Sequence, residues 1–288
     1  MRNPACSEAT TEHRLHWAFS TLGCPDLDLA EAACLAAQYG LDGIEARVVK
    51  GRLDLPILFD QTYGTPEAFA AAVRVLPARL IALATGVRLS QFPSNRAELL
   101  AFLPWAEAAC VPFLRVFDGE AAGLSTAEVV SRIIRALNWW QREKVRNRWQ
   151  VDLLIEPHWA LTEPQSLRRF LDADIQRDRG SLLWDIQHTL FEGGTEPLEF
   201  WEEFKPYIRH IHVKDGRVIA TRKTYQHSLP GDGDAPVMPL LNTLKAEGYR
   251  GFISLEWERH WHPELPSLRD ALRAAVSAGW LRDSRKPS

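Results

Sequence analysis

The sequence has little cysteine. Its 288 residues include four, at positions 6, 24, 34 and 110, and none of them forms a CxxC pair. A structural zinc site or a redox motif would normally use such a pair. The few unpaired cysteines therefore predict reduced thiols in a cytoplasmic protein, and they argue against a disulfide framework.

Long apolar runs and an excess of basic residues are missing as well. No stretch reaches the about 18 consecutive apolar residues of a membrane-spanning helix. Residues 1–14 are polar and lack the apolar core of a signal peptide, so we expect a flexible N-terminal extension there. A net charge of −3 and a pI near 6.3 give no electrostatic reason to expect nucleic acid or an anionic membrane as a partner.

The chain does contain one unit repeated eight times, namely a short apolar run, a polar loop and an amphipathic stretch at helical spacing. The apolar runs predict strands at His16–Ser20, Gly43–Arg47, Arg79–Ala84, Phe113–Phe117, Asp152–Glu156, Ser181–Asp185, Ile208–Val213 and Gly251–Glu256. The amphipathic stretches predict helices at Asp28–Tyr39, Pro66–Leu76, Asn95–Ala109, Thr126–Arg148, Pro164–Ala173, Pro197–Phe204, Ala235–Glu247 and Leu268–Ala278.

Alternating units of this length form parallel sheets through right-handed crossovers, and eight of them close into a (β/α)8 TIM barrel. The competing α/β fold is an open, doubly wound sheet, which usually carries a glycine-rich GxGxxG motif in its first turn. The corresponding turn here, Thr21–Asp26, reads TLGCPD and does not fit that motif. We therefore expect a single barrel domain over residues 15–280 and a polar tail at 281–288.

Four of the predicted strands end on residues that can bind a metal: Glu156, Asp185, His212 and Glu256. Side chains alternate along a strand, and in each of these strands the ligand-type residue has the phase that faces the barrel interior. Singly, such a residue is more often a helix cap, a solvated charge or a hydrogen-bonded core histidine. Together they predict an oxygen-rich site that suits Mn²⁺ first, and also Mg²⁺, Co²⁺ or Zn²⁺.

Several motifs in this part of the chain resemble a known family. The block WDIQH is followed by a Gly-Gly loop, by HIHVKD, by LPGDGD and by GYRGFISLEWE. This series is similar to the xylose isomerase-like TIM barrels, in particular to the sugar phosphate isomerase/epimerase group. The resemblance spans nearly the whole chain and is densest over residues 154–258.

The resemblance implies roles for particular residues. Glu156, Asp185, His212 and Glu256 match the four metal ligands, and Glu156 and Glu256 also match the pair that moves protons in the epimerases. His188 matches a position that binds a substrate oxygen, and Arg217 lies close to an arginine that touches the substrate. The EPH of residues 156–158 and the HVKD of residues 212–215 are closer to the dehydratase and general isomerase branches than to the ketose 3-epimerases.

Other residues have two interpretations from sequence. Lys214 shares the inward phase of His212, so it either contacts substrate or forms an ion pair with Glu256 or Asp185. His158 and Trp257 lie just past strand ends, where each either stacks on a sugar or is buried under a loop.

Two further predictions concern a pair of charged residues and a turn. Glu45 and Arg47 share one inward face and are expected to pair with each other or with Arg115. The LPGDGD segment of residues 229–234 has no lysine and is expected to form a turn rather than a phosphate cradle.

A divalent cation chelated by a carbonyl and an adjacent hydroxyl acidifies the neighbouring C–H by stabilising an enediolate. The sequence thus predicts a metal-dependent isomerase or epimerase acting on a small sugar, keto-polyol or sugar phosphate. An inosose-type dehydratase would use the same site. An apurinic-type DNA endonuclease and a non-catalytic sugar-binding barrel are the alternatives from other classes. The resemblance to the family implies a homodimer or homotetramer.

Overall fold

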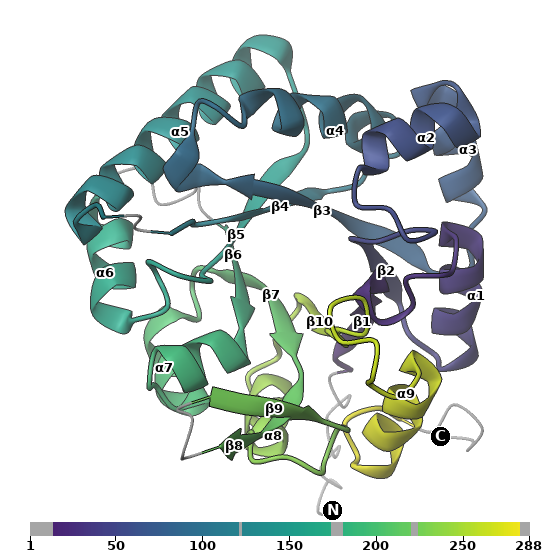
Figure 1. Ribbon diagram of the computed structural model, residues 1–288, viewed down its shortest axis with the longest axis vertical. Coiled ribbons are helices and arrows are strands. Elements are labelled where there is room, and N and C mark those ends of the chain that lie inside the picture. The colour runs from purple at the N-terminus through teal and green to yellow at the C-terminus, as the bar shows by residue number, and fades with distance from the viewer. Residues whose placement is uncertain (1–13, 121–122, 174–180, 220–223, 283–288) are drawn as a thin grey trace, which may run out of the picture.

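The computed structural model describes residues 14–120, 123–173, 181–219 and 224–282. Eight parallel strands form a closed barrel in which each strand lies beside its neighbours in the chain (Figure 1). They are β1 (His16–Ser20), β2 (Gly43–Ala46), β3 (Arg79–Arg88), β4 (Phe113–Phe117), β5 (Asp152–Glu156), β6 (Ser181–Asp185), β7 (Ile208–Val213) and β10 (Phe252–Leu255). The predicted (β/α)8 barrel is confirmed.

Helices surround the barrel on its outside (Figure 1). They are α1 (Leu29–Gln38), α2 (Leu55–Tyr63), α3 (Pro66–Arg74), α4 (Arg96–Ala108), α5 (Thr126–Asn147), α6 (Pro164–Ala173), α7 (Pro197–Phe204), α8 (Val237–Ala246) and α9 (Leu268–Ser277). Asp28 and Ser125 each form a capping box at the start of a helix, because each side chain accepts the N–H of the third helical residue. None of the helices in the described ranges is long and apolar enough to cross a membrane.

The structure adds two elements that the sequence patterns did not predict. Helix α2 buries only Leu55 and Phe59, so its apolar spacing is too sparse to reveal a helix. An antiparallel hairpin, β8 (Asp215–Ile219) with β9 (Thr224–Ser228), follows β7 after a single residue. Strand β3 also continues four residues beyond its predicted end, to Arg88.

The turn at residues 229–234 is folded around the Asp215 carboxylate. This carboxylate accepts hydrogen bonds from the backbone N–H groups of Gly231 and Gly233 at 2.9 and 3.1 Å. A Cβ atom at Gly233 would lie 2.0 Å from Asp215 Oδ1, so glycine is required there. The N–H groups that a phosphate cradle would need already donate to the Asp215 carboxylate, in agreement with the predicted turn.

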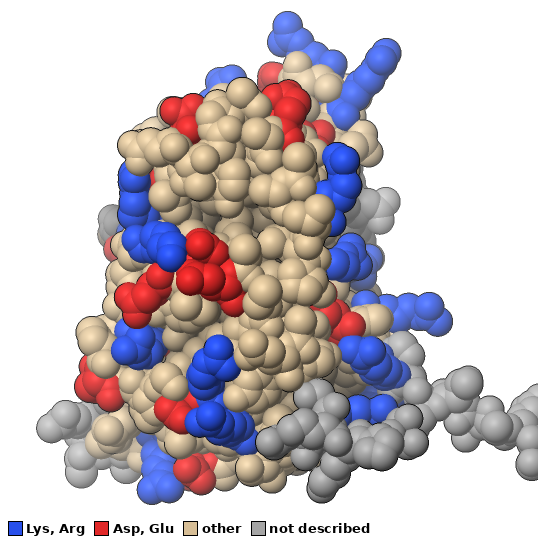
Figure 2. Space-filling model, turned by 90° about the vertical axis from the view of Figure 1, so that its right-hand side faces the viewer, with Lys and Arg blue, Asp and Glu red and all other residues tan. Residues whose placement is uncertain are grey.

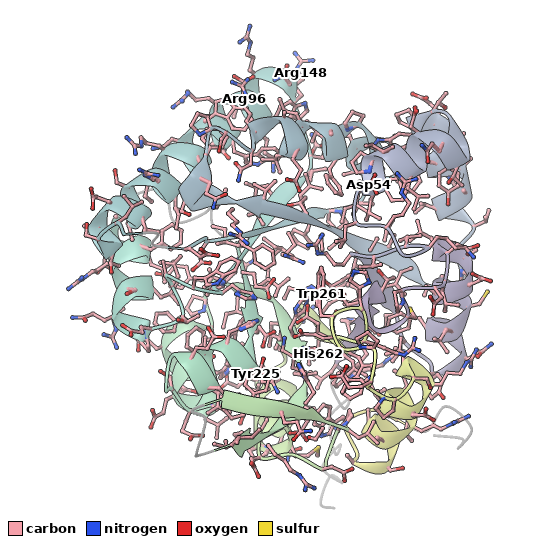
Figure 3. The ribbon with its side chains drawn as sticks, in the orientation of Figure 1. Asp54, Arg96, Arg148, Tyr225, Trp261 and His262 are labelled. Carbon is pink, nitrogen blue, oxygen red and sulfur yellow. The ribbon has the colours of Figure 1, made fainter. Side chains whose placement is uncertain are left out.

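Charges are mixed on the outer surface. On the face shown in Figure 2, Lys and Arg alternate with Asp and Glu, and no broad area of one sign appears. The barrel interior differs, since buried charged and polar side chains gather at the carboxyl ends of its strands. Figure 3 shows Trp261 and His262, from the loop after β10, at the opening of the barrel. The barrel therefore places its concentrated polar chemistry where TIM-barrel enzymes hold their active sites.

Candidate metal centre

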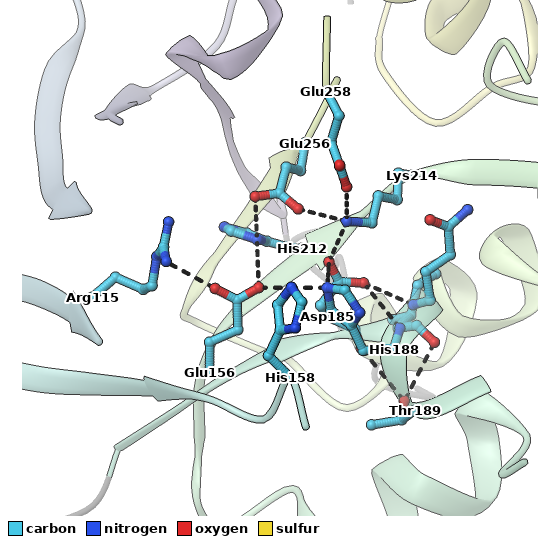
Figure 4. Close-up of polar contacts among 12 residues, drawn as sticks. Arg115, Glu156, His158, Asp185, His188, Thr189, His212, Lys214, Glu256 and Glu258 are labelled. Atoms are coloured by element: carbon cyan, nitrogen blue, oxygen red, sulfur yellow. Dashed lines mark hydrogen bonds and ion pairs between the residues drawn. The ribbon is translucent and has the colours of Figure 1, made fainter. Parts of the chain in front are cut away.

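The four ligand-type residues converge at one point inside the barrel. Glu156 ends β5, Asp185 ends β6, His212 lies in β7 and Glu256 follows β10. One ligand atom from each lies within 4.8 Å of the corresponding atoms of the other three, and all four residues are buried (Figure 4). The strand phase had predicted this convergence, because side chains of equal phase on parallel strands meet on the barrel axis.

Several of these ligand atoms are buried without a hydrogen bond. Among the described residues, Glu156 Oε2, Asp185 Oδ2 and His212 Nδ1 make no hydrogen bond, although each lies in an ion pair at 2.8 to 3.3 Å. The other oxygen of Asp185 accepts the backbone N–H of Gln187 at 2.8 Å, which directs Oδ2 towards the other ligands. Buried carboxylates that gather at one point are costly unless positive charge compensates them. Three carboxylates and one imidazole therefore fit a divalent cation, which would satisfy all of them.

Glu45, at the inward face of β2, orients the histidine of this group. Its carboxylate lies 3.0 Å from His212 Nε2, which leaves Nδ1 facing Glu256 Oε1 at 3.2 Å. Glu45 also contacts His210 Nε2 at 2.7 Å. The expectation that Glu45 pairs with Arg47 or Arg115 is wrong. Closure of the barrel places β7 across the axis from β2, so Glu45 meets the two histidines of β7 instead. His210 is a hydrogen-bonded core histidine, bonded also to Ser254 at 3.0 Å.

A carboxylate behind a metal-binding histidine fixes its tautomer and strengthens its basicity. We expect Glu45→Gln to lower the affinity for Mn²⁺ by about 10- to 100-fold, which is the typical effect of losing such a partner. Glutamine keeps an acceptor oxygen but loses the negative charge. Titration calorimetry with Mn²⁺ would measure the change. An unaltered affinity would show that Glu45 supports the fold alone.

The surroundings of His212 favour its protonated form. Burial lowers the pKa of its imidazole, but the carboxylates of Glu256 and Glu45 on either side outweigh burial and raise the pKa well above its usual value. The proton on Nδ1 occupies the position at which a metal would bind. Metal binding must therefore displace that proton.

Because of this displacement, we expect the apparent affinity for Mn²⁺ to rise with pH, by up to about tenfold per pH unit for each proton released. Below the raised pKa of His212 the proton competes with the metal, and above it the competition ends. Calorimetric titrations in buffers of different protonation enthalpy would count the protons. An affinity that stays constant between about pH 6 and pH 8 would contradict the arrangement.

Lys214 forms the ion pairs that were one of its two interpretations. Its Nζ lies 2.8 Å from Asp185 Oδ2 and 2.7 Å from Glu256 Oε2, and it also contacts Glu258 (Figure 4). Burial lowers the pKa of this ammonium, but the three carboxylates outweigh burial and raise it well above its usual value. Lys214 thus supplies positive charge at the edge of the ligand group, and Glu258 is a neighbour that the sequence did not single out.

His188 lies beside the ligand group, as the resemblance implied. Its Nε2 is 3.4 Å from Asp185 Oδ2 and 3.8 Å from Glu156 Oε1. Burial lowers the pKa of His188, but Asp185 and the other carboxylates raise it overall to about 9. His158 packs against His188 with ring centroids 4.1 Å apart, and burial together with that neighbour lowers its pKa to about 2. The two rings form one wall of the site.

Asp118 holds the segment that carries His158, and no pattern in the sequence predicts this role. Its buried carboxylate accepts the backbone N–H groups of His158 and Leu161 at 3.1 and 2.8 Å. Burial raises its pKa to about 6 despite these hydrogen bonds. An acidic residue one position after a predicted strand is too common to stand out.

Two predicted substrate contacts lie elsewhere. Trp257 is 1% exposed and its Nε1 donates to the carbonyl oxygen of Pro266 at 2.8 Å, so it is buried under the following loop and offers no face to a sugar. Arg217 is an exposed residue of β8, and its Nε donates to the carbonyl oxygen of Asp232 at 2.7 Å. The hairpin, which the sequence did not reveal, directs Arg217 to the turn.

Comparison with known proteins agrees with the fold. The family model of xylose isomerase-like TIM barrels matches residues 34–283. Inosose dehydratase of Lacticaseibacillus casei is 30% identical over an alignment of 95 residues, which covers 28% of this chain and 32% of that protein. The match thus spans about a third of the length of this curated relative.

Solved structures share the whole barrel. The 3-keto-D-glucoside 4-epimerase of E. coli has a TM-score of 0.68 at 15% identity, over 93% of this chain and 99% of that one. The IolI protein with a bound zinc atom has a TM-score of 0.74 at 15% identity, over 92% and 96%. Such low identities establish the shared fold alone. The family match, however, covers most of the sequence, and the chain therefore belongs to the xylose isomerase-like TIM barrel family.

Proposed function

We propose that this protein is a metal-dependent isomerase or epimerase of polyhydroxy ketones. Glu156, Asp185, His212 and Glu256 would hold the divalent ion, for which Mn²⁺ is our first candidate and zinc, bound by the similar IolI protein, the second. The observation that carries the proposal is the convergence of three buried carboxylates and one imidazole at the carboxyl end of the barrel. When bound, the ion would acidify the C–H next to a substrate carbonyl.

Glu156 and Glu256 would move the proton. They extend from β5 and β10, with β6 and β7 between them, and so reach the site from different sides. Burial raises the pKa of Glu156 against the opposing effect of Arg115, whereas Lys214 and His212 outweigh burial and lower the pKa of Glu256. Environments that separate two carboxyl pKa values suit one proton donor and one acceptor. Such a pair can remove a proton at one position and return it at another.

His188 would position the substrate. Its ring lies between Asp185 and the half-buried His158, so a substrate oxygen beside the metal ligands could bond to its Nε2. This buried wall also excludes water, which would otherwise compete for the developing negative charge.

Dehydration is the second candidate. It shares the proton abstraction and then uses the second acid to help a β-hydroxyl group leave. The similarity to inosose dehydratase favours it, as do the EPH and HVKD segments. The site residues would be the same.

An apurinic-type endonuclease would need further metal ions. A second group of possible ligands, His227, Glu258 and His262, does lie together. The net charge of −3, however, gives no electrostatic reason to expect DNA as the substrate. Robust nicking of abasic-site DNA in the presence of zinc would favour this alternative. No affinity for any divalent metal on titration would favour a non-catalytic barrel.

The test of the proposed function is deuterium exchange. The Mn²⁺-loaded protein would be incubated in D₂O with ketoses, inososes and their phosphates, and NMR would locate the exchanged carbon. Exchange next to a carbonyl with return of the ketone indicates isomerisation or epimerisation, and an unsaturated product indicates dehydration. Exchange that persists undiminished in Asp185→Ala would refute the assigned site.

A further inference from the structure

Arg115, in the middle of β4, is a buried cation with unused hydrogen-bond donors. The residue is 2% exposed, and its Nε and Nη1 have no hydrogen-bond partner among the described residues. Its Nε lies 3.3 Å from Glu156 Oε2, outside hydrogen-bond geometry, and its guanidinium lies 4.0 Å from the ring centroid of Phe117 (Figure 4). One ion pair and one ring contact leave most of the five guanidinium donors without an acceptor.

A second arginine lies beside it. Ala46 pairs with Leu83, and Leu83 pairs with Leu114, on the neighbouring strands β2, β3 and β4. The next residue along each strand is Arg47, Ala84 and Arg115, so the two arginines flank an alanine at one level of the barrel. Ala84, between the two long side chains, carries only a methyl group.

Arg47 is half-buried and has no ion pair or side-chain hydrogen bond within the described part of the chain. Its backbone is held in place, because its N–H donates to the Thr21 hydroxyl at 2.9 Å. Burial and, next, the positive charge of Arg115 lower its pKa to about 9. The carboxylates of Glu98, Glu156 and Glu256 act in the opposite sense but lie too far away for a direct pair. Two like charges thus face the same space.

Such an arrangement costs free energy unless an anion compensates it. A guanidinium fork fits the oxygens of a carboxylate or a phosphate, which can accept two parallel hydrogen bonds from it. The carboxylate that pairs with Arg115, Glu156, belongs to the metal centre. The compensating anion would therefore come with the ligand.

We propose that Arg47 and Arg115 form an oxyanion subsite next to the metal centre, so that the substrate carries a carboxylate or a phosphate in addition to its keto-polyol part. This inference rests on the proposed function, because it specifies the substrate class of the same site. The anion would thus bind at Arg47 and Arg115 and not at Arg217, whose side chain is hydrogen bonded to the turn at Asp232.

Matched ligand pairs test the subsite. Titration calorimetry of the Mn²⁺-loaded protein would compare quinate with myo-inositol, and fructose 6-phosphate with fructose. We expect the anionic member of at least one pair to bind about 10- to 100-fold more tightly, as charge-assisted hydrogen bonds allow. The first pair tests a carboxylate and the second tests a phosphate.

Variants distinguish anion binding by the arginine pair from anion binding by the metal. Arg47→Gln should remove most of the anion preference and leave the neutral ligands and the metal content unaffected. Arg52→Gln is the matched control, because Arg52 lies near Arg47 but pairs with Asp54 at 2.6 Å. Arg115→Lys keeps a charge beside Glu156 and loses the fork, so it should weaken anion binding without unfolding the site.

The outcomes are distinguishable. An anion preference of equal size in wild type and Arg47→Gln would mean that the oxyanion binds the metal and would overturn the subsite. Equal binding within both pairs, or no binding of either anionic ligand, would overturn it as well. Loss of metal binding or of deuterium exchange, with an Arg47-dependent anion preference retained, would count against the proposed function alone.

Discussion

Replacing Asp185 or His212 with alanine is expected to remove bound metal and turnover together. Either change deletes one of four converging ligands and leaves at least two buried carboxylates facing each other. The loss of affinity should exceed the about 10- to 100-fold effect of removing an outer partner of a ligand. Elemental analysis of the purified variants, together with the deuterium-exchange assay, would measure both quantities.

The control for this experiment is Glu258→Gln. Glu258 is a carboxylate of the same region that contacts Lys214 but lies outside the four-ligand group, so metal content should persist. Circular dichroism should show an intact barrel in all three variants, because the strands are held mainly by their apolar outer faces. Unchanged metal content in both Asp185→Ala and His212→Ala would disprove the ligand assignment.

The second large effect separates metal binding from proton transfer. Glutamine at position 156 or 256 keeps the size of the side chain and a ligand oxygen, but it loses the charge and the ability to accept a proton. We expect both variants to retain part of their Mn²⁺ affinity and to lose turnover by about 10²- to 10⁴-fold, the usual contribution of general acid-base catalysis. Steady-state rates at saturating Mn²⁺ would measure the loss.

The two variants need not behave alike. If Glu156 and Glu256 serve different faces or different carbons of the substrate, one variant will still exchange the substrate proton with D₂O and fail to form product. The isotope pattern then identifies which residue acts first. Full activity in both variants, with metal restored, would mean that neither is the base and would leave Lys214 or His188 to move the proton.

Patterns in the amino-acid sequence predict both the barrel and the convergence of the four ligand-type residues. Eight short apolar runs alternate with amphipathic stretches, and this pattern leaves few folds open. Once the strands are parallel and closed, the period of two along each strand places Glu156, Asp185, His212 and Glu256 on the inside at one end. These features depend on local pattern alone, which is why they could be predicted.

Which side chains meet depends on the three-dimensional fold. Glu45 contacts His212 rather than Arg47, because closure brings residues 167 positions apart to opposite sides of one axis. Arg47 and Arg115 become neighbours through the register of β2, β3 and β4, which no single strand encodes. The loop after β10 buries Trp257, and the β8–β9 hairpin turns Arg217 outward. Neither segment has a hydrophobic periodicity from which its backbone path could be predicted. Local sequence patterns specify the phase of a side chain, whereas its partner depends on strand register and loop conformation.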